Sequence, residues 1–222
     1  KYIVEMMKQR EMNMFDQADA NPFISTFFFG YMMPKMMEPA LPNAEVQKLL
    51  HSDEKFDVVI VEQFMNNAEK ALATHFGAPL VVVSALGANF WLNTLVGNSA
   101  PPSYIPMVVT DYSAPMTFCE RLLNSLLFVV TDVYFNLVVY PAENEIIKKN
   151  IPNGPDLFDV LYNASIVLVN SHPSLNQPVP YVPNMIEVGG FHVTPPKKLP
   201  QDLQEFLDNA KDGVIYFSMG SN

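Results

Sequence analysis

The chain has 222 residues, enough for one large domain or for one domain and part of a second, and its 49% hydrophobic content excludes a mainly disordered chain. Its 13 lysines and arginines against 23 aspartates and glutamates give a formal net charge of -10. Without a basic cluster such a chain cannot neutralise a phosphate backbone, so we exclude nucleic acid as a partner. The single cysteine, Cys119, can form no intramolecular disulfide and belongs to no Cys/His ligand pattern, so we expect no metal site.

The first fifty residues are predicted to contain two helices and an apolar stretch. Residues 2–17 mix apolar and charged side chains, which is typical of an amphipathic helix or a lid. A second apolar stretch starts at Pro22, and we expect Gly30 and Pro34 to break it. A short helix follows over 43–51, with Asn43 as its N-cap.

The strongest fold signal is a strand, a helix and a second strand in succession. The β-branched run Val58–Val61 is typical of a strand buried on both faces of a parallel sheet. Asn66 or Asn67 can cap the following helix, which ends at Gly77, and residues 79–84 form the second buried strand. Elements of these lengths make a right-handed βαβ unit, which predicts an α/β protein with a doubly wound parallel sheet.

The second half of the chain begins with a long loop set over 85–112, whose length indicates a functional role. Residues 116–140 are apolar but interrupted by charges, which favours a mostly buried or surface-docked helix over a membrane span, with partial membrane contact as the weaker alternative. A short helix and two further strands are expected over 155–161, 165–170 and 185–188.

A proline-rich stretch over 194–200 predicts a semi-rigid linker and a domain boundary. We therefore assign residues 1–193 to one α/β domain that is truncated at its start. Residues 201–222 would be the truncated beginning of a second domain, with a helix over 201–210 and a strand over 213–217. Both ends of the chain are interpreted as cuts within a longer protein.

Glu62 stands where the first predicted strand ends. Ligands of open α/β sheets gather at the carboxyl ends of the strands, so this position makes Glu62 a candidate for chemistry. The alternative is an exposed carboxylate that is stabilised by the dipole of the following helix. The residues around Glu62 leave both interpretations open.

Small residues follow the last predicted strand. Ser218, Gly220 and Ser221 could let backbone N–H groups approach a phosphate, because glycine has no Cβ, but the residues alone favour an ordinary turn. No GxGxxG or GxxxxGK[ST] motif occurs, so dinucleotide and P-loop sites lack support.

Five spaced motifs cover nearly the whole chain: Pro101–Pro106, Met116–Arg121, Asn163–His172, Val188–His192 and Val214–Ser221. Together and in this order they resemble the UDP-glycosyltransferases, in the animal and insect branch of the UDP-glucuronosyltransferase-like family. The resemblance implies two Rossmann-like domains of the GT-B type. This chain would be most of the N-terminal, acceptor-binding domain and the start of the UDP-sugar-binding domain.

The resemblance also implies an inverting transfer of glucose or glucuronic acid from a UDP-sugar to a hydroxyl of a small lipophilic acceptor. Glu62 matches the carboxylate that orients the catalytic histidine, although many relatives carry aspartate there. That histidine lies upstream of Lys1 in the family. His51 and His75 fall near predicted helix ends and are interpreted as capping or surface residues. The chain alone is therefore expected to be inactive.

Further roles follow from the resemblance. Ser218, Gly220 and Ser221 would face the diphosphate or the nucleoside of the donor, with no metal involved. Phe90 and Trp91 would line the acceptor pocket, although ordinary core packing explains this aromatic pair as well.

Asn163 begins the N-glycosylation sequon of the chain. A glycan there would fit the resemblance, which implies a detoxifying glycoprotein on the lumenal side of the endoplasmic reticulum membrane, held by a C-terminal anchor. A homo-oligomer is left open. Two rival hypotheses are a non-catalytic glycosyltransferase-like domain that binds hydrophobic molecules and a plain ligand-binding α/β protein.

Overall fold

The structure is a computed structural model that describes residues 21–113 and 115–218. The predicted opening helix, and the predicted donor residues Gly220 and Ser221, lie outside the described residues. The chain divides into two compact units, Lys1–Gly190 and Phe191–Asn222, which are described separately. The assignment of functions to domains stays a prediction.

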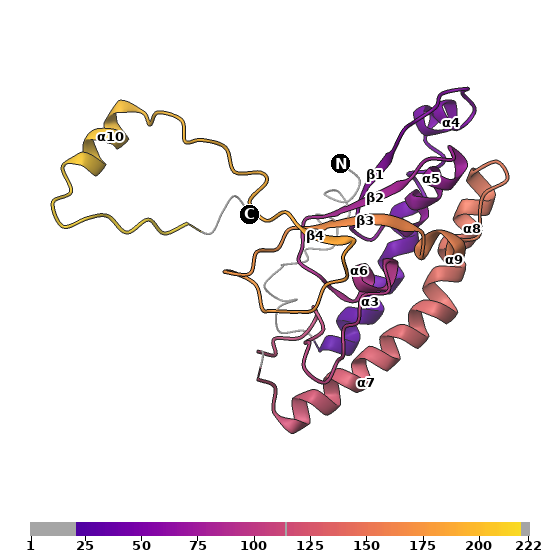
Figure 1. The fold of residues 1–222 in the computed structure, drawn as a ribbon, viewed down its shortest axis with the longest axis horizontal. Helices are drawn as coiled ribbons and strands as arrows, with labels where there is room; N and C mark the ends of the chain where they lie inside the picture. The colour runs from indigo at the N-terminus through magenta and orange to yellow at the C-terminus, as the bar shows by residue number, and fades with distance from the viewer. Residues whose placement is uncertain (1–20, 114, 219–222) are drawn as a thin grey trace. The chain divides into compact units, whose positions relative to one another are not determined.

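The first unit is built on a four-stranded parallel sheet with the order β1-β2-β3-β4, as Figure 1 shows. Its strands are β1 (Val59–Glu62), β2 (Leu80–Ser84), β3 (Ala164–Val169) and β4 (Met185–Glu187). The prediction of an α/β protein with a parallel sheet is confirmed, and the strand positions agree with the sequence to within a few residues. Because the strands are parallel, their carboxyl ends meet at one edge of the sheet.

The prediction that the first strand is buried on both faces was wrong. In β1, Val61 is buried whereas Ile60 is 64% exposed. The reason is that Val59 and Val61 point to the covered face of β1, whereas Ile60 and Glu62 point to a face that is left exposed. The β-branched run therefore packs through one face only, and its side chains alternate between core and solvent.

The helices in chain order are α3 (Pro22–Met37), α4 (Ala44–Leu50), the 3₁₀ turn η1 (Asn67–Lys70), α5 (Ala71–His75), α6 (Phe90–Leu95), α7 (Phe118–Tyr134), the π-helical turn η2 (Phe135–Val139), α8 (Tyr140–Asn150), α9 (Leu157–Leu161) and α10 (Gln201–Asp208). Asn43 caps α4 as predicted, since its side chain accepts a hydrogen bond from the N–H of Glu45. Gly77 ends α5 with a positive φ of 62°.

Helix α3 continues through Gly30 and Pro34, so the predicted break is absent. Gly30 serves a packing role instead, because a Cβ there would collide with the ring of Tyr134 and lie 2.9 Å from Cγ2 of Val139. The helix loses the hydrogen bond that Pro34 cannot donate. Contacts of α3 with α7, η2 and α8 hold it in place on the same side of the sheet (Figure 1).

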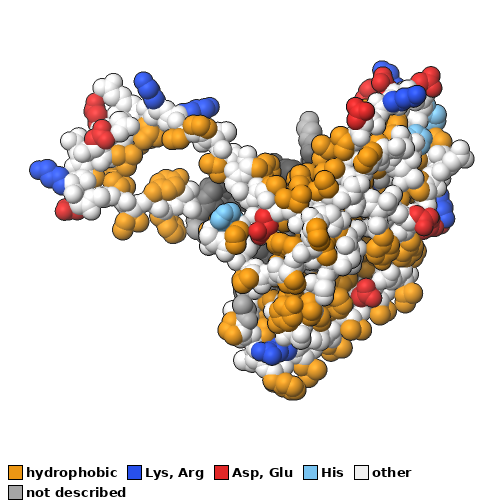
Figure 2. Space-filling model, viewed as in Figure 1, with side chains coloured by type: hydrophobic (Ala, Val, Ile, Leu, Met, Phe, Trp, Pro, Cys, Tyr) orange, Lys and Arg blue, Asp and Glu red, His pale blue; other side chains and the backbone are white. Residues whose placement is uncertain are grey.

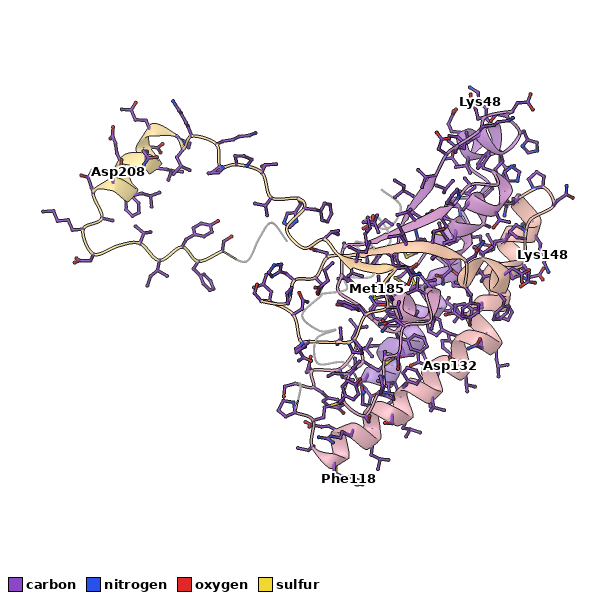
Figure 3. The ribbon with its side chains drawn as sticks, in the orientation of Figure 1. Lys48, Phe118, Asp132, Lys148, Met185 and Asp208 are labelled. Carbon is purple, nitrogen blue, oxygen red and sulfur yellow. The ribbon has the colours of Figure 1, made fainter. Side chains whose placement is uncertain are left out.

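Helices α7, η2 and α8 form one continuous helix over Phe118–Asn150, which is docked on the surface rather than mostly buried. By length and composition this helix could cross a membrane, but core helices of soluble proteins can be equally long and apolar. In its most apolar 18-residue stretch, 28% of the residues are buried. Figure 2 shows apolar side chains along it, and Figure 3 draws them from Phe118 to Asp132. Six of its eight large exposed apolar residues recur at helical spacing: Phe118, Leu122, Leu126, Val129, Val133 and Leu137.

The second unit contains α10, which confirms the predicted helix, but residues 213–217 form no strand. Ile215, Tyr216 and Phe217 are each more than 80% exposed. A strand is held by hydrogen bonds to a neighbour. No strand lies alongside these residues in the part of the chain that the structure describes, which explains why the β-rich sequence stays extended without forming one.

A buried polar network joins the end of β1 to α8 in the core of the first unit. Asn67 stands at its centre: its Oδ1 accepts from Nζ of Lys70 at 2.9 Å and from Nε2 of Gln63 at 3.3 Å, and its Nδ2 donates to Oε2 of Glu143 at 3.0 Å. Lys70 and Glu143 are both fully buried. The two charged groups therefore meet through an amide and are not in direct contact.

Burial shifts the pKa of both charged groups toward the neutral form. It lowers the pKa of the Lys70 ammonium to about 8, although the charges of Glu143 and Glu69 raise it. It raises the pKa of the Glu143 carboxyl to about 7, although the hydrogen bond from Asn67 and the charge of Lys70 lower it. Each group thus depends on the other to remain ionised inside the protein.

We expect the variant Lys70→Met to lose stability as the pH rises, because Glu143 is then an unpaired buried acid. A carboxyl whose pKa is raised on folding stabilises the native state below its unfolded value of 4.5, and this contribution is lost as the pH rises through the folded value. The double variant Lys70→Met/Glu143→Gln carries no such carboxyl and is the matched control. Urea unfolding should show a stability deficit of the single relative to the double variant that grows by about 2 to 3 kcal/mol between roughly pH 5 and pH 8.

An equal deficit at both pH values would show that Glu143 does not titrate in the folded protein, and would contradict this description of the network.

Candidate functional site

Glu62 is the last residue of β1, and its side chain is exposed at the carboxyl edge of the sheet. It stands opposite Val83 of β2, and the next backbone N–H, that of Gln63, donates to the carbonyl of Val83 at 2.7 Å. The ladder thus extends just past Glu62. Because side chains alternate along a strand, Glu62 faces solvent while Gln63 is 93% buried.

Asn66 fixes the turn that follows Glu62. Its Nδ2 donates to the carbonyl of Glu62 at 2.6 Å and to Oε2 of Glu69 at 2.8 Å, while its Oδ1 accepts from the N–H of Phe64 at 2.9 Å. Asn66 therefore makes no side-chain cap for η1, and Asn67 belongs to the buried network, so the prediction that either residue caps this helix was wrong. The same turn places Met65 at a positive φ of 57°.

The ends of β2 and β3 carry further polar groups at the same edge of the sheet. Ser84 is fully buried and its Oγ accepts from the N–H of Leu86 at 3.1 Å. Asn170 donates from its backbone to the carbonyl of Ser84 at 3.0 Å, and its Nδ2 donates to the carbonyl of Ala85 at 3.0 Å. These hydrogen bonds connect the segments that follow β2 and β3, so they fix the backbone at the carboxyl edge of the sheet.

A mainly apolar pocket of about 120 Å³ adjoins Gln63, the residue that follows Glu62. It lies between α3, the turn after β1 and the segment around α6, whose side chains are drawn in Figure 3. It is lined by Phe29, Met33, Gln63, Phe64, Met65, Leu86, Asn89, Trp91, Val108 and Val109. Apolar walls with few polar groups are the usual composition of a small-molecule site.

Of the predicted aromatic pair, Trp91 lines this pocket and Phe90 faces away from it. Both belong to α6, a helix inside the region that the sequence indicated as loops; Asn89 caps it by accepting from the N–H of Trp91 at 3.1 Å. Phe90 is buried against Phe128, with ring centroids 5.2 Å apart, and lines a second cavity of about 130 Å³. Their roles as acceptor-binding residues stay predictions.

A larger hollow of about 380 Å³ lies at the opposite edge of the sheet, near the amino ends of β2 and β3. It is lined in part by Leu80 and Ser165 at the start of these strands, and by Asn163 of the predicted sequon. Ligands of parallel sheets bind at the carboxyl ends, so we assign the candidate site to the smaller pocket beside Glu62. Asn163 itself is exposed in the turn before β3.

None of the three histidines of the first unit, His51, His75 and His172, hydrogen-bonds Glu62. The imidazole of His51 meets the carbonyl of Gln47 at 2.7 Å, and that of His75 meets the carbonyl of Leu50 at 2.9 Å, which confirms both as capping residues of α4. His172 contacts Ser174, as an exposed residue. The orienting role of Glu62 therefore stays a prediction about a base outside the described residues.

Sequence reasoning missed the polar residues around Glu62. Gln63, Asn66 and Asn67 were visible as a cluster of amides after a strand, which is a signal for a structured turn. Their partner Glu143 lies 76 positions from Asn67, so no local pattern connects the two. Of the predicted donor residues, Ser218 is described and is exposed in the second unit.

Comparison with known proteins agrees with the five motifs. The family model for UDP-glucoronosyl and UDP-glucosyl transferase matches residues 2–222. The chain is 33% identical to UDP-glycosyltransferase UGT5 of Dactylopius coccus, over 95% of this chain and 41% of that protein. It is 35% identical to UDP-glucosyltransferase 2 of the same insect, over 76% and 33%. It is 30% identical to UDP-glucuronosyltransferase 2B19 of Macaca fascicularis, over 87% and 37%.

The chain thus spans 41% or less of the length of these three relatives, and its match to the family extends over both of its units. The parallel sheet agrees with the fold that the motifs implied. The chain belongs to the family of UDP-glucuronosyl and UDP-glucosyl transferases.

Proposed function

We propose that this chain is the acceptor-binding half of a UDP-glycosyltransferase. The whole protein would transfer glucose or glucuronic acid, with inversion at the sugar, from a UDP-sugar to a hydroxyl of a small lipophilic molecule. The names of the relatives support these two sugars, since they include a glucosyltransferase and a glucuronosyltransferase. The donor would bind mainly to the second domain, through the loop that holds Ser218, Gly220 and Ser221.

The observation that carries this proposal is the position of Glu62 beside an apolar pocket. The pocket offers a lipophilic ring a place next to the sheet edge. Among the described residues none hydrogen-bonds the exposed carboxylate of Glu62, which can therefore accept the N–H of an imidazole. Such a carboxylate holds one tautomer of the base and stabilises the imidazolium that forms when the acceptor loses its proton. We expect the base itself to come from residues outside the described range.

We further propose that the protein is a glycoprotein on the lumenal side of the endoplasmic reticulum membrane and acts in detoxification. The exposed sequon at Asn163 supports this position, because N-glycosylation marks surface positions of secretory-pathway proteins. The exposed apolar side chains along α7 are compatible with contact to a membrane surface.

A non-catalytic domain that binds hydrophobic molecules remains the second candidate. The observation that favours it is that none of the histidines of the first unit hydrogen-bonds Glu62. A histidine in the sequence before Lys1, placed after a first strand, would support the enzyme. Its absence would support the binder.

In the full-length protein, we expect Glu62→Gln to lower kcat by about 100-fold or more, because the amide no longer stabilises an imidazolium. The KM for a phenolic acceptor should change by less than about threefold, since Glu62 is not among the described residues that line the apolar pocket. Glu62→Asp should retain part of the activity. Steady-state kinetics with saturating UDP-glucose or UDP-glucuronate measure both parameters.

The matched control is Glu187→Gln, which removes an exposed carboxylate at the end of β4, at the same edge of the sheet. It should leave kcat unchanged. Wild-type turnover by Glu62→Gln, or an equal loss with both variants, would refute the role of Glu62.

The 222-residue chain alone should transfer no sugar and should bind UDP-glucose weakly or not at all, because the predicted donor domain is represented by residues 201–222 only. Isothermal titration calorimetry tests this expectation. Micromolar affinity for UDP-glucose would show that the donor site is assigned to the wrong part of the protein.

A further inference from the structure

The backbone of Glu62 faces the free edge of the sheet. In a parallel ladder, the N–H and the C=O of one residue bond to the same neighbouring strand, and alternate residues bond to opposite neighbours. Val59 donates its N–H to the carbonyl of Pro79, next to β2, at 3.0 Å. Gln63 donates in the same direction, to the carbonyl of Val83 in β2 at 2.7 Å. The carbonyl of Glu62 therefore points away from β2, to the side where no described strand pairs with β1.

The side chain of Asn66 meets this outward carbonyl. Its Nδ2 donates to the carbonyl of Glu62 at 2.6 Å, and its Oδ1 accepts from the N–H of Phe64 at 2.9 Å. A carbonyl can only accept and a backbone N–H can only donate, so these two contacts fix the orientation of the amide. Asn66 is 8% exposed, and its amide holds the segment from Glu62 to Phe64 at both ends.

The same turn contains a residue in a disfavoured backbone conformation. Met65 has a positive φ of 57°, a region that residues with a Cβ rarely adopt because the Cβ crowds a backbone carbonyl. Such a conformation persists where the surrounding contacts hold it. The two hydrogen bonds of Asn66 close the turn that contains Met65. Without them we expect the turn to relax, and the last peptide group of β1 to move with it.

The direction of the Glu62 side chain depends on this backbone. Among the described residues none hydrogen-bonds its exposed carboxylate, so no contact at the carboxylate fixes where it points. The ladder to β2 holds one side of the strand end, and Asn66 holds the other. A carboxylate that supports a base must stay within about 0.5 Å of its working position, and a shift of about 1 Å can lower a rate about 100-fold.

We propose that Asn66 is a positioning residue for Glu62. By holding the outward carbonyl, it sets the direction in which the carboxylate leaves the strand and meets the base. This inference rests on the proposed function, because it takes Glu62 to be the carboxylate that orients the base. Asn66 acts through the backbone of Glu62 and is not itself a catalytic residue.

The test is the double variant Asn66→Asp/Glu69→Gln in the full-length protein. In the structure, Nδ2 of Asn66 also donates to Oε2 of Glu69 at 2.8 Å. The exchange keeps the net charge, a side-chain hydrogen bond between these two positions and an acceptor for the N–H of Phe64. It removes the donor to the carbonyl of Glu62. The single variant Glu69→Gln shows what the moved charge contributes.

We expect the double variant to lower kcat, at saturating donor and acceptor, by about tenfold relative to Glu69→Gln. A carboxylate beside an imidazole raises its pKa, so a displaced Glu62 lowers the pKa of the base. The acidic limb of kcat/KM should therefore move to lower pH by about half a unit, the direction in which Glu62→Gln also moves it. Added to Glu62→Gln, the exchange should cause no further loss of kcat, because no carboxylate remains to be positioned.

The matched control is Asn150→Asp. Nδ2 of Asn150 donates to the carbonyl of Ile146 at 2.8 Å, so this change breaks the same kind of hydrogen bond at the end of α8. It should leave kcat and the acidic limb unchanged. If the double variant does not fold, Asn66→Ser takes its place, because a single hydroxyl oxygen cannot span both contacts of the amide, and the same readouts decide.

An unchanged kcat with an unmoved acidic limb in the folded variant would overturn the proposal. An equal loss of kcat in Asn150→Asp or in Glu69→Gln would also overturn it, as would a loss that persists undiminished in the Glu62→Gln background. Lost turnover in Glu62→Gln without a loss in the double variant refutes the positioning role alone. Wild-type turnover by Glu62→Gln refutes the proposed function, and the positioning role with it.

Discussion

The turn after β1 depends on one constraint, the buried Asn67 that connects Lys70 on one side with Glu143 on the other. This amide lets two charged side chains remain inside the core without contact between them. It also fixes the last residues of the strand, because Gln63 bonds to the same oxygen. Neighbouring Asn66 holds the carbonyl of Glu62. The hydrogen bonds of Asn67 and Asn66 therefore hold the end of the strand rigid.

Two consecutive side chains at this rigid strand end point in opposite directions. Alternation along β1 turns Glu62 to solvent and Gln63 to the core, where it meets the apolar pocket beside Trp91. Helix α3 closes that pocket with Phe29 and Met33, and its close approach to Tyr134 at Gly30 keeps it against the long helix. A carboxylate that can support a base and a pocket that can hold a ring are thus placed next to each other by the same element.

The sequence predicted the parallel sheet, most element positions and the exposed carboxylate, because β-branched runs and Gly77 are local signals. The sequence-based predictions were wrong where contacts between residues far apart in the chain determine the structure. Pro34 breaks no helix, since packing of α3 against α7 and α8 offsets the lost hydrogen bond. Ile60 is exposed because it points to the face of β1 that is left uncovered in the described structure. The partner of Asn67 on α8 has no signature in the local sequence.

The most direct test of the account is a crystal structure of the full-length protein with UDP and a lipophilic acceptor that carries a hydroxyl. We predict that an apolar part of the acceptor occupies the pocket beside Trp91. Its hydroxyl should meet a histidine whose other ring nitrogen donates to the Glu62 carboxylate. An acceptor bound away from this pocket, or a Glu62 carboxylate with no imidazole beside it, would contradict the account.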